Sequence, residues 1–112
     1  MNEEDEMSFN VLFIAHAPDA DKQRHRSEID TGTYRLLSVI VRNQPEAIDA
    51  AREIVETQNI DMILLCPGFT HADVAEIYHA FEGRIGVAVA RGDGPSNRIS
   101  AQARKREGYT RS

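Results

Sequence analysis

The sequence predicts an α/β fold built on a four-stranded, mainly parallel sheet with flanking helices. Two observations lead to this prediction. Apolar runs of strand length alternate with segments in which apolar residues recur every three or four positions. The most continuous apolar run, residues 60–66, stops at Pro67 and Gly68, and a capped helix start follows at Thr70. This alternation of strand, loop and helix is typical of parallel α/β domains.

Composition restricts the class of protein. The 112 residues fit one domain, and the net charge of −5 argues against nucleic acid or an anionic membrane as the main partner. A single cysteine excludes an internal disulfide and suits a reducing compartment. The amino end is acidic, so it shows no secretory or mitochondrial signal, and the apolar runs are far shorter than the ~20 residues of a membrane helix. We therefore expect a soluble cytoplasmic protein with no membrane partner.

Both ends of the chain are polar. Residues 1–8 are acidic and predict a disordered N-terminal tail, whereas residues 95–112 predict a basic C-terminal tail. The region between them, residues 9–94, has the composition of a single globular α/β domain. Nucleic acid is an unlikely partner of the basic tail; a solvated arm that meets the acidic body or a neighbouring subunit is the favoured interpretation.

The expected strands are residues 9–16, 34–41, 60–66 and 85–90, with helices at 45–58 and 70–81. A flavodoxin-like order of 2-1-3-4 is favoured among several possible orders. It places residues 34–41 at an edge, because Arg35 and Ser38 interrupt the apolar run, and residues 60–66 near the centre. The first strand has apolar residues on both faces, which predicts helices above and below it.

Residues 19–30 are the least determined segment. Only Ala20 and Ile29 could anchor a helix there, so the segment is interpreted either as a weakly packed helix or as a polar flap. Without a helix, the first two strands could run antiparallel, and His16 or Arg42 would then leave the edge shared by the other strand ends.

If the strands are parallel, their carboxyl ends bring side chains from distant parts of the chain together. Because open α/β sheets bind ligands at this edge, we expect an anion site there. A helix N-terminus also favours anions. The alternative is that the arginines only end their strands in water or pair with nearby aspartates. The candidate ligand-binding residues from this argument are His16, Arg42, Cys66, Thr70, His71 and Arg91.

Cys66 and His16 are the candidates for a catalytic pair of nucleophile and base, although Cys66 is favoured as a small apolar residue that closes a buried strand. No second cysteine or His/Cys cluster has metal-ligand spacing, so no metal is expected. The first strand–loop junction lacks the glycines of a dinucleotide-binding or P-loop motif, and no cofactor is identified.

Several stretches resemble a family of small, uncharacterised, single-domain α/β proteins that are catalogued as a domain of unknown function. The more specific of them are the loop CPGF and the histidine-containing segment ADKQRHRSEIDT, and the resemblance spans about residues 9–91. It implies an α/β fold and added weight for His25, Cys66 and Gly68, which makes Gly68 a further candidate ligand-binding residue. Pro67 stands where a second glycine is commoner in that family. The resemblance implies no reaction.

Three functions follow as hypotheses. The first is a small-molecule-binding domain that takes an anionic metabolite at the carboxyl edge of the sheet. The second is a structural or assembly role as a homo-oligomer, most simply a dimer, without a pocket. The third is a cysteine-dependent hydrolase or acyl-transfer enzyme that uses Cys66. The sequence ranks them in this order and leaves open the ligand, the reaction and the role of Cys66.

Overall fold

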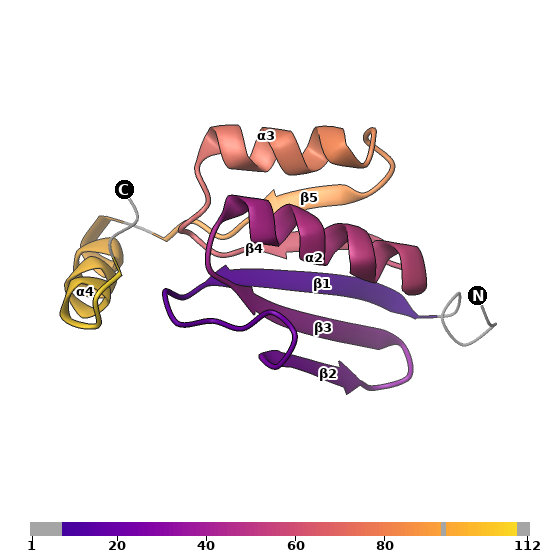
Figure 1. Ribbon diagram of the computed structural model, residues 1–112, viewed down its shortest axis with the longest axis horizontal. Coiled ribbons are helices and arrows are strands. Elements are labelled where there is room, and N and C mark those ends of the chain that lie inside the picture. The colour runs from indigo at the N-terminus through magenta and orange to yellow at the C-terminus, as the bar shows by residue number, and fades with distance from the viewer. Residues whose placement is uncertain (1–7, 93, 110–112) are drawn as a thin grey trace.

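The chain forms one mixed five-stranded sheet with helices packed on one of its faces (Figure 1). The computed structural model describes residues 8–92 and 94–109. In chain order the elements are β1 (Phe9–His16), β2 (Arg26–Asp30), β3 (Tyr34–Val41), α2 (Gln44–Thr57), β4 (Met62–Leu65), α3 (His71–Ala80), β5 (Gly86–Val89) and α4 (Gly94–Arg106).

The strand order is β2-β3-β1-β4-β5. β1 pairs in parallel with β3 on one side and with β4 on the other, and β4 pairs in parallel with β5. The four strands expected from the sequence therefore lie in the predicted order. The predicted sheet is nevertheless only partly right, because a fifth strand, β2, pairs antiparallel with β3 and makes the sheet mixed.

The prediction for residues 19–30 is corrected by β2. The segment is neither a helix nor only a flap, since its second half is a strand at the edge of the sheet. For the same reason the prediction that residues 34–41 form an edge strand is wrong. β2 also reverses the chain direction before β3 begins, which keeps β1 and β3 parallel although no helix connects them.

A buried arginine holds β2 in place. Arg35 of β3 is only 6% exposed; its Nε donates to Glu28 Oε2 on β2 at 2.9 Å, and its guanidinium also bonds the Gln58 side chain that follows α2. A second ion pair links the start of β2 to α2, where Arg26 meets both carboxylate oxygens of Glu53 at 3.0 and 3.2 Å. The hydrogen bond from Arg26 lowers the pKa of the Glu53 carboxyl. Arg35, the polar residue that interrupts the second predicted strand, thus links β3 to β2 and to the end of α2.

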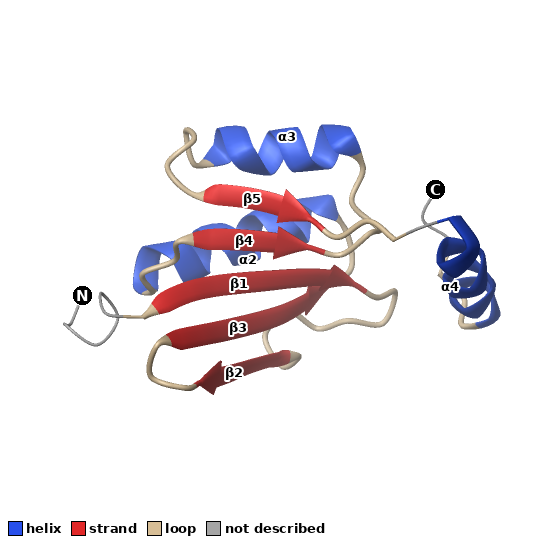
Figure 2. Ribbon diagram, turned by 180° about the vertical axis from the view of Figure 1, so that it is seen from behind, coloured by secondary structure: helices blue, strands red, loops and turns tan. Residues whose placement is uncertain are grey.

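The hydrophobic core lies between the sheet and α2 with α3. Alternate residues of the strands point into it, as the period of two in a strand requires. The central strands contribute Leu12, Ile14, Val39, Val41, Ile63 and Leu65, all with no exposed area. Figure 2 shows the sheet in front of α2, with α3 beyond the edge strand β5. Ile77 of α3 belongs to the same core cluster, and Gln44 of α2 donates to Glu76 of α3 at 2.8 Å, so both helices lie on the same side of the sheet. The prediction that β1 has helices above and below it is wrong, because a strand replaces the helix that would have covered the other face.

The segment expected as a basic tail contains helix α4, which lies beyond the carboxyl ends of the strands (Figure 1). None of its side chains is fully buried, which explains why apolar periodicity did not reveal it. The expected acidic tail lies mainly at residues 1–7, outside the described residues. Among the helices that the structure does describe, none combines the length and apolar content needed to cross a bilayer.

We predict that Arg35→Ala lowers the free energy of unfolding by about 2 kcal/mol, because it removes two hydrogen bonds to a charged donor at a buried position. Chemical denaturation measures this loss. Arg52→Ala, at an exposed position on α2, is the control and should change the free energy by less than about 0.5 kcal/mol. Equal effects of the two substitutions would show that the Arg35 cluster does not stabilise the sheet.

Candidate functional site

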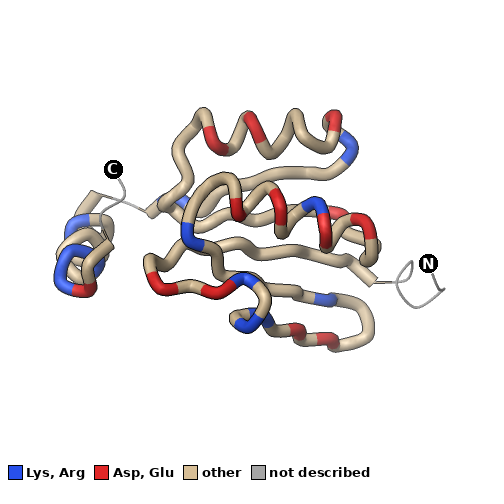
Figure 3. The backbone as a smooth tube through the Cα atoms, viewed as in Figure 1, with Lys and Arg blue, Asp and Glu red and all other residues tan. Residues whose placement is uncertain are grey.

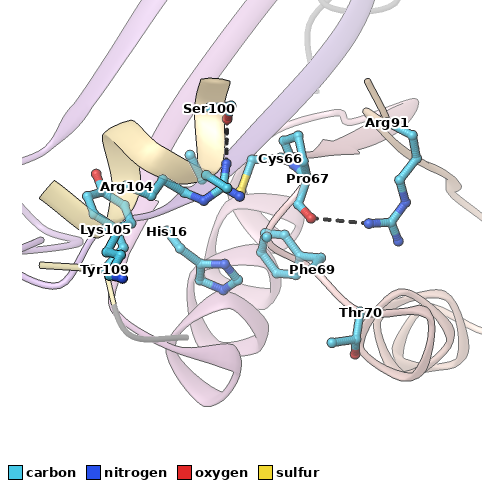
Figure 4. A pocket seen from close by; sticks show the side chains of 13 residues that line it. His16, Cys66, Pro67, Phe69, Thr70, Arg91, Ser100, Arg104, Lys105 and Tyr109 are labelled. Atoms are coloured by element: carbon cyan, nitrogen blue, oxygen red, sulfur yellow. Dashed lines mark hydrogen bonds between the residues drawn. The ribbon is translucent and has the colours of Figure 1, made fainter. Parts of the chain in front are cut away.

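A cavity of about 610 Å³ lies between the carboxyl edge of the sheet and α4 (Figure 4). One wall is formed by Ala15 and His16 at the end of β1 and by the loop from Cys66 to Thr70, which follows β4. Arg91, just after β5, and residues from the second half of α4 form the rest. The cavity is where parallel strand topology predicts a site, and it is within the usual size range of small-molecule sites.

An aromatic pair forms the floor. The imidazole of His16 stacks on the ring of Phe69, with centroids 4.0 Å apart and an angle of 27° between the planes. Phe69 is fully buried in the core and so fixes the position of the pair. Both ring nitrogens of His16 are shielded from solvent, so the ring does not offer an open base to the cavity in this conformation.

The loop after β4 brings Cys66 and Gly68 against His16. The Cys66 N–H donates to the Ile14 carbonyl at 3.1 Å, which extends the β1–β4 pairing to the end of the strand. The Phe69 N–H returns to the Cys66 carbonyl at 3.2 Å and closes a turn through Pro67 and Gly68. A Cβ on Gly68 would lie 3.2 Å from His16 Nδ1 and 3.5 Å from Cys66 Sγ. The distance to His16 is shorter than side chains normally pack, so a residue other than glycine would require the His16 ring to shift by a few tenths of an ångström.

The start of α3 carries the capping box that the sequence predicts. The Asp73 N–H donates to Thr70 Oγ1 at 3.1 Å, and the Thr70 N–H donates to Asp73 Oδ2 at 2.9 Å. Thr70 lines the cavity. Its box, however, places a carboxylate at the helix start, which offsets the attraction of the helix dipole for an anion. The helix N-terminus therefore attracts an anion less strongly than its position alone indicates.

The charge of the cavity comes from Arg91, Arg104 and Lys105, and its described lining contains no Asp or Glu. Arg91 donates from Nη1 to the Pro67 carbonyl at 3.1 Å, which holds its guanidinium beside the loop. Arg104 donates from Nη1 to Ser100 Oγ at 2.5 Å on the same helix. Figure 4 shows Arg104 reaching from α4 toward Cys66. Cations from a strand end and from a helix thus border one cavity.

The structure brings together five of the seven candidate ligand-binding residues. His16, Cys66, Gly68, Thr70 and Arg91 all line the cavity.

Two candidates lie outside the described lining. Arg42 donates from Nε to the Ala20 carbonyl at 2.6 Å and so holds the loop before β2. His71 is exposed on α3. His25, to which the family resemblance gave weight, is exposed in the same loop as Ala20, where its Nδ1 accepts a hydrogen bond from the Asp21 N–H at 2.9 Å.

Sequence reasoning missed the contribution of α4. Ser100, Arg104, Lys105 and Tyr109 line the cavity although the segment was expected to be a tail. The only signal was the density of basic residues between 98 and 106, which was interpreted as a solvated arm. In the described part of the chain, no group of three or more His, Cys, Asp or Glu side chains is arranged to hold a metal ion.

Comparison with known proteins identifies one family. A family model matches residues 9–105, and its description is a family of unknown function, DUF6506. The match runs from the start of β1 almost to the end of α4, and it confirms the resemblance to a family of small uncharacterised proteins. Comparison with curated proteins and with solved structures finds no match. The description of the family names no reaction, so a function for this chain has to be inferred from the residues of the site.

We predict that Gly68→Ala destabilises the protein by about 1 kcal/mol, because the new methyl group crowds the His16 ring, which is stacked on Phe69. The free energy of unfolding measures the effect. Gly94→Ala is the matched control, since a Cβ there meets no atom within 4 Å. If the two variants are equally stable, the floor of the cavity is looser than its contacts indicate.

Proposed function

The chain belongs to this family of unknown function, and we propose that it binds a small anionic metabolite in the cavity between the carboxyl edge of the sheet and α4. The single observation that carries the proposal is the charge of the lining. Three cationic side chains border the cavity, and no acidic residue occurs in its described lining.

The contrast with the rest of the chain supports a specific attraction. The protein has a net charge of −5, yet Lys and Arg gather on α4 while acidic residues predominate on α2 (Figure 3). A cleft lined by one sign of charge concentrates ions of the opposite sign. Arginines recognise carboxylate and phosphate groups through parallel hydrogen bonds, which makes these groups the expected anionic part of the ligand.

The floor supports a ligand that also has a planar or apolar part. His16, Cys66 and Pro67 give the lining an apolar part beside its cations, and the buried ring of Phe69 stacks on His16 and supports it. Ligand sites commonly combine such an apolar part with a few polar groups that fix orientation. A free inorganic ion would use the arginines but not this surface, so a small organic phosphate or carboxylate fits the cavity better.

The position of α4 indicates how binding would proceed. The helix begins at Gly94, shortly after Gly92, and it has no fully buried residue that would anchor it to the sheet. An anion held between Arg91 on the sheet side and Arg104 or Lys105 on α4 would bridge the two parts. Bound ligand would then hold α4 across the cavity and exclude water from it.

A thermal-shift screen with small organic phosphates and carboxylates tests the proposal. We expect at least one compound class to raise the melting temperature, since a ligand that binds only the folded state stabilises it. For the best compound, calorimetry should show that Arg104→Gln weakens binding about tenfold or more, because a charge-assisted hydrogen bond is lost.

Arg98→Gln is the matched control for this loss. Arg98 is exposed on the same helix and outside the described lining of the cavity, so its removal changes the net charge equally but leaves the site intact. Affinity should change less than about twofold. Equal losses in the two variants would reduce the effect to general charge attraction, and a screen without any stabilising compound would contradict the proposal.

A further inference from the structure

One face of the sheet is left open. α2 covers one face, and the loop between β1 and β2 runs on that side as well (Figure 1 and Figure 2). α3 lies beyond β5 and contributes Ile77 to the same core. No helix packs on the opposite face anywhere in the described ranges 8–92 and 94–109. Parallel strands normally have both faces covered, because their side chains are apolar on both. The open face therefore lacks the packed helix that normally covers parallel strands of this composition.

The strand register identifies the side chains of this face. Core residues such as Leu12 and Val39 point toward the helices, so the alternate positions point away from them. The open face carries no charged residue: it consists of Ser27 and Ile29 from β2; Tyr34, Leu36, Ser38 and Ile40 from β3; Phe9, Val11, Phe13 and Ala15 from β1; Met62 and Leu64 from β4; and Gly86 and Ala88 from β5.

Several large side chains of this face are exposed to solvent, whereas Val11 on the central strand is only 2% exposed. Six large hydrophobic residues are exposed in the described part of the chain, and four of them, Phe9, Ile29, Tyr34 and Ile40, lie on this face. A contiguous apolar patch of this kind marks an interaction surface. We propose that the open face binds the same face of a second copy of this chain, which makes the protein a dimer with two sheets packed face to face.

Three observations favour a second copy as the occupant. The face is uncharged, so two negatively charged copies meet there without repulsion between like charges. The face is also large enough. Each strand residue occupies about 3.3 Å along the strand and about 4.8 Å across the sheet, so the strands cover roughly 460 Å² in each copy. The solvent-accessible area of the face exceeds this flat area, because side chains project from it. Two such faces reach the ~1,000 Å² that a specific interface needs in total.

The third observation is the distribution of side-chain size. Bulky rings lie at the amino ends of the two longest strands, at Phe9 and Tyr34, where they contact edge to face with centroids 5.6 Å apart. Aliphatic side chains, Ala15 and Ile40, lie at the carboxyl ends of the same two strands. A two-fold axis between the sheets and perpendicular to the strands places Phe9 of one copy over Ala15 of the other and Tyr34 over Ile40, so that rings meet smaller aliphatic side chains and not other rings.

The free edge of β2 is a poorer interface. Arg26, Glu28 and Asp30 alternate along this strand, and two of them are already engaged in ion pairs with Glu53 and Arg35. Charged residues on an edge strand oppose pairing with another strand. Association through the face, not through the edge, is therefore the arrangement that the strand residues favour.

Sedimentation equilibrium of the full chain, from micromolar to submillimolar concentration, tests this proposal. We expect the wild type to have twice the mass of one chain and Tyr34→Glu to raise the dimer dissociation constant about a hundredfold, because a charge enters the apolar interface of each copy. Tyr78→Glu is a closely matched control: Tyr78 is 46% exposed against 41% for Tyr34, and it lies on α3, away from the open face. It should leave the dissociation constant unchanged.

Circular dichroism determines whether each variant folds. If Tyr34→Glu does not fold, Ser38→Lys decides, since it adds a charge at the centre of the face without removing an apolar side chain. A folded, monomeric Ser38→Lys variant supports the face-to-face dimer, and a dimeric one overturns it. A monomeric wild type at every concentration, or equal effects of Tyr34→Glu and Tyr78→Glu, also overturns it.

Discussion

The antiparallel pairing of β2 with β3, stabilised by the ion pair between Glu28 and the buried Arg35, is the constraint on which the rest of the structure depends. Because β2 returns the chain along the outside of β3, β1 and β3 remain parallel without a helical crossover. The carboxyl ends of β1, β4 and β5 consequently share one edge, where the cavity lies. The same replacement of a helix by a strand leaves one face of the sheet uncovered. The cavity and the apolar face are therefore two results of one topological substitution.

Much of the sheet was predictable because its four parallel strands are apolar enough to be recognised, and their order follows from short, right-handed connections. β2 could not be found in this way. Its sequence, RSEID, has one apolar residue, and that residue, Ile29, points to the open face and gives no burial signal. The charge of Arg35 predicts an edge strand, but Arg35 lies on β3, the strand that pairs with the edge strand β2. Its charge is buried because Glu28 and Gln58 lie on either side of it, and only tertiary structure could show that.

The predicted site residues divide in a similar way. His16, Cys66 and Arg91 lie together because each ends or directly follows a parallel strand, and such positions follow from topology alone. Arg42 also follows a strand, but its guanidinium donates to the Ala20 carbonyl and does not reach the cavity. Ala20 lies there because β2 brings the loop before it across the end of β3. The α4 cations were not predictable, since that helix has no buried side chain and therefore no apolar period. The capping box at Thr70 was predictable because it depends only on residues close together in the sequence. The carboxylate of this box makes the helix N-terminus less attractive to an anion than expected.

The proposed function requires an anion to bind between the sheet edge and α4. The most direct measurement is a two-dimensional amide NMR titration of the full chain with a small organic phosphate or carboxylate. If an anion binds in the cavity, the titration will show saturable shifts confined to residues 66–70, to Arg91 and to the second half of α4. Shifts that spread over exposed cations far from the cavity, such as Arg24, Arg52 and Arg84, without saturation would contradict it.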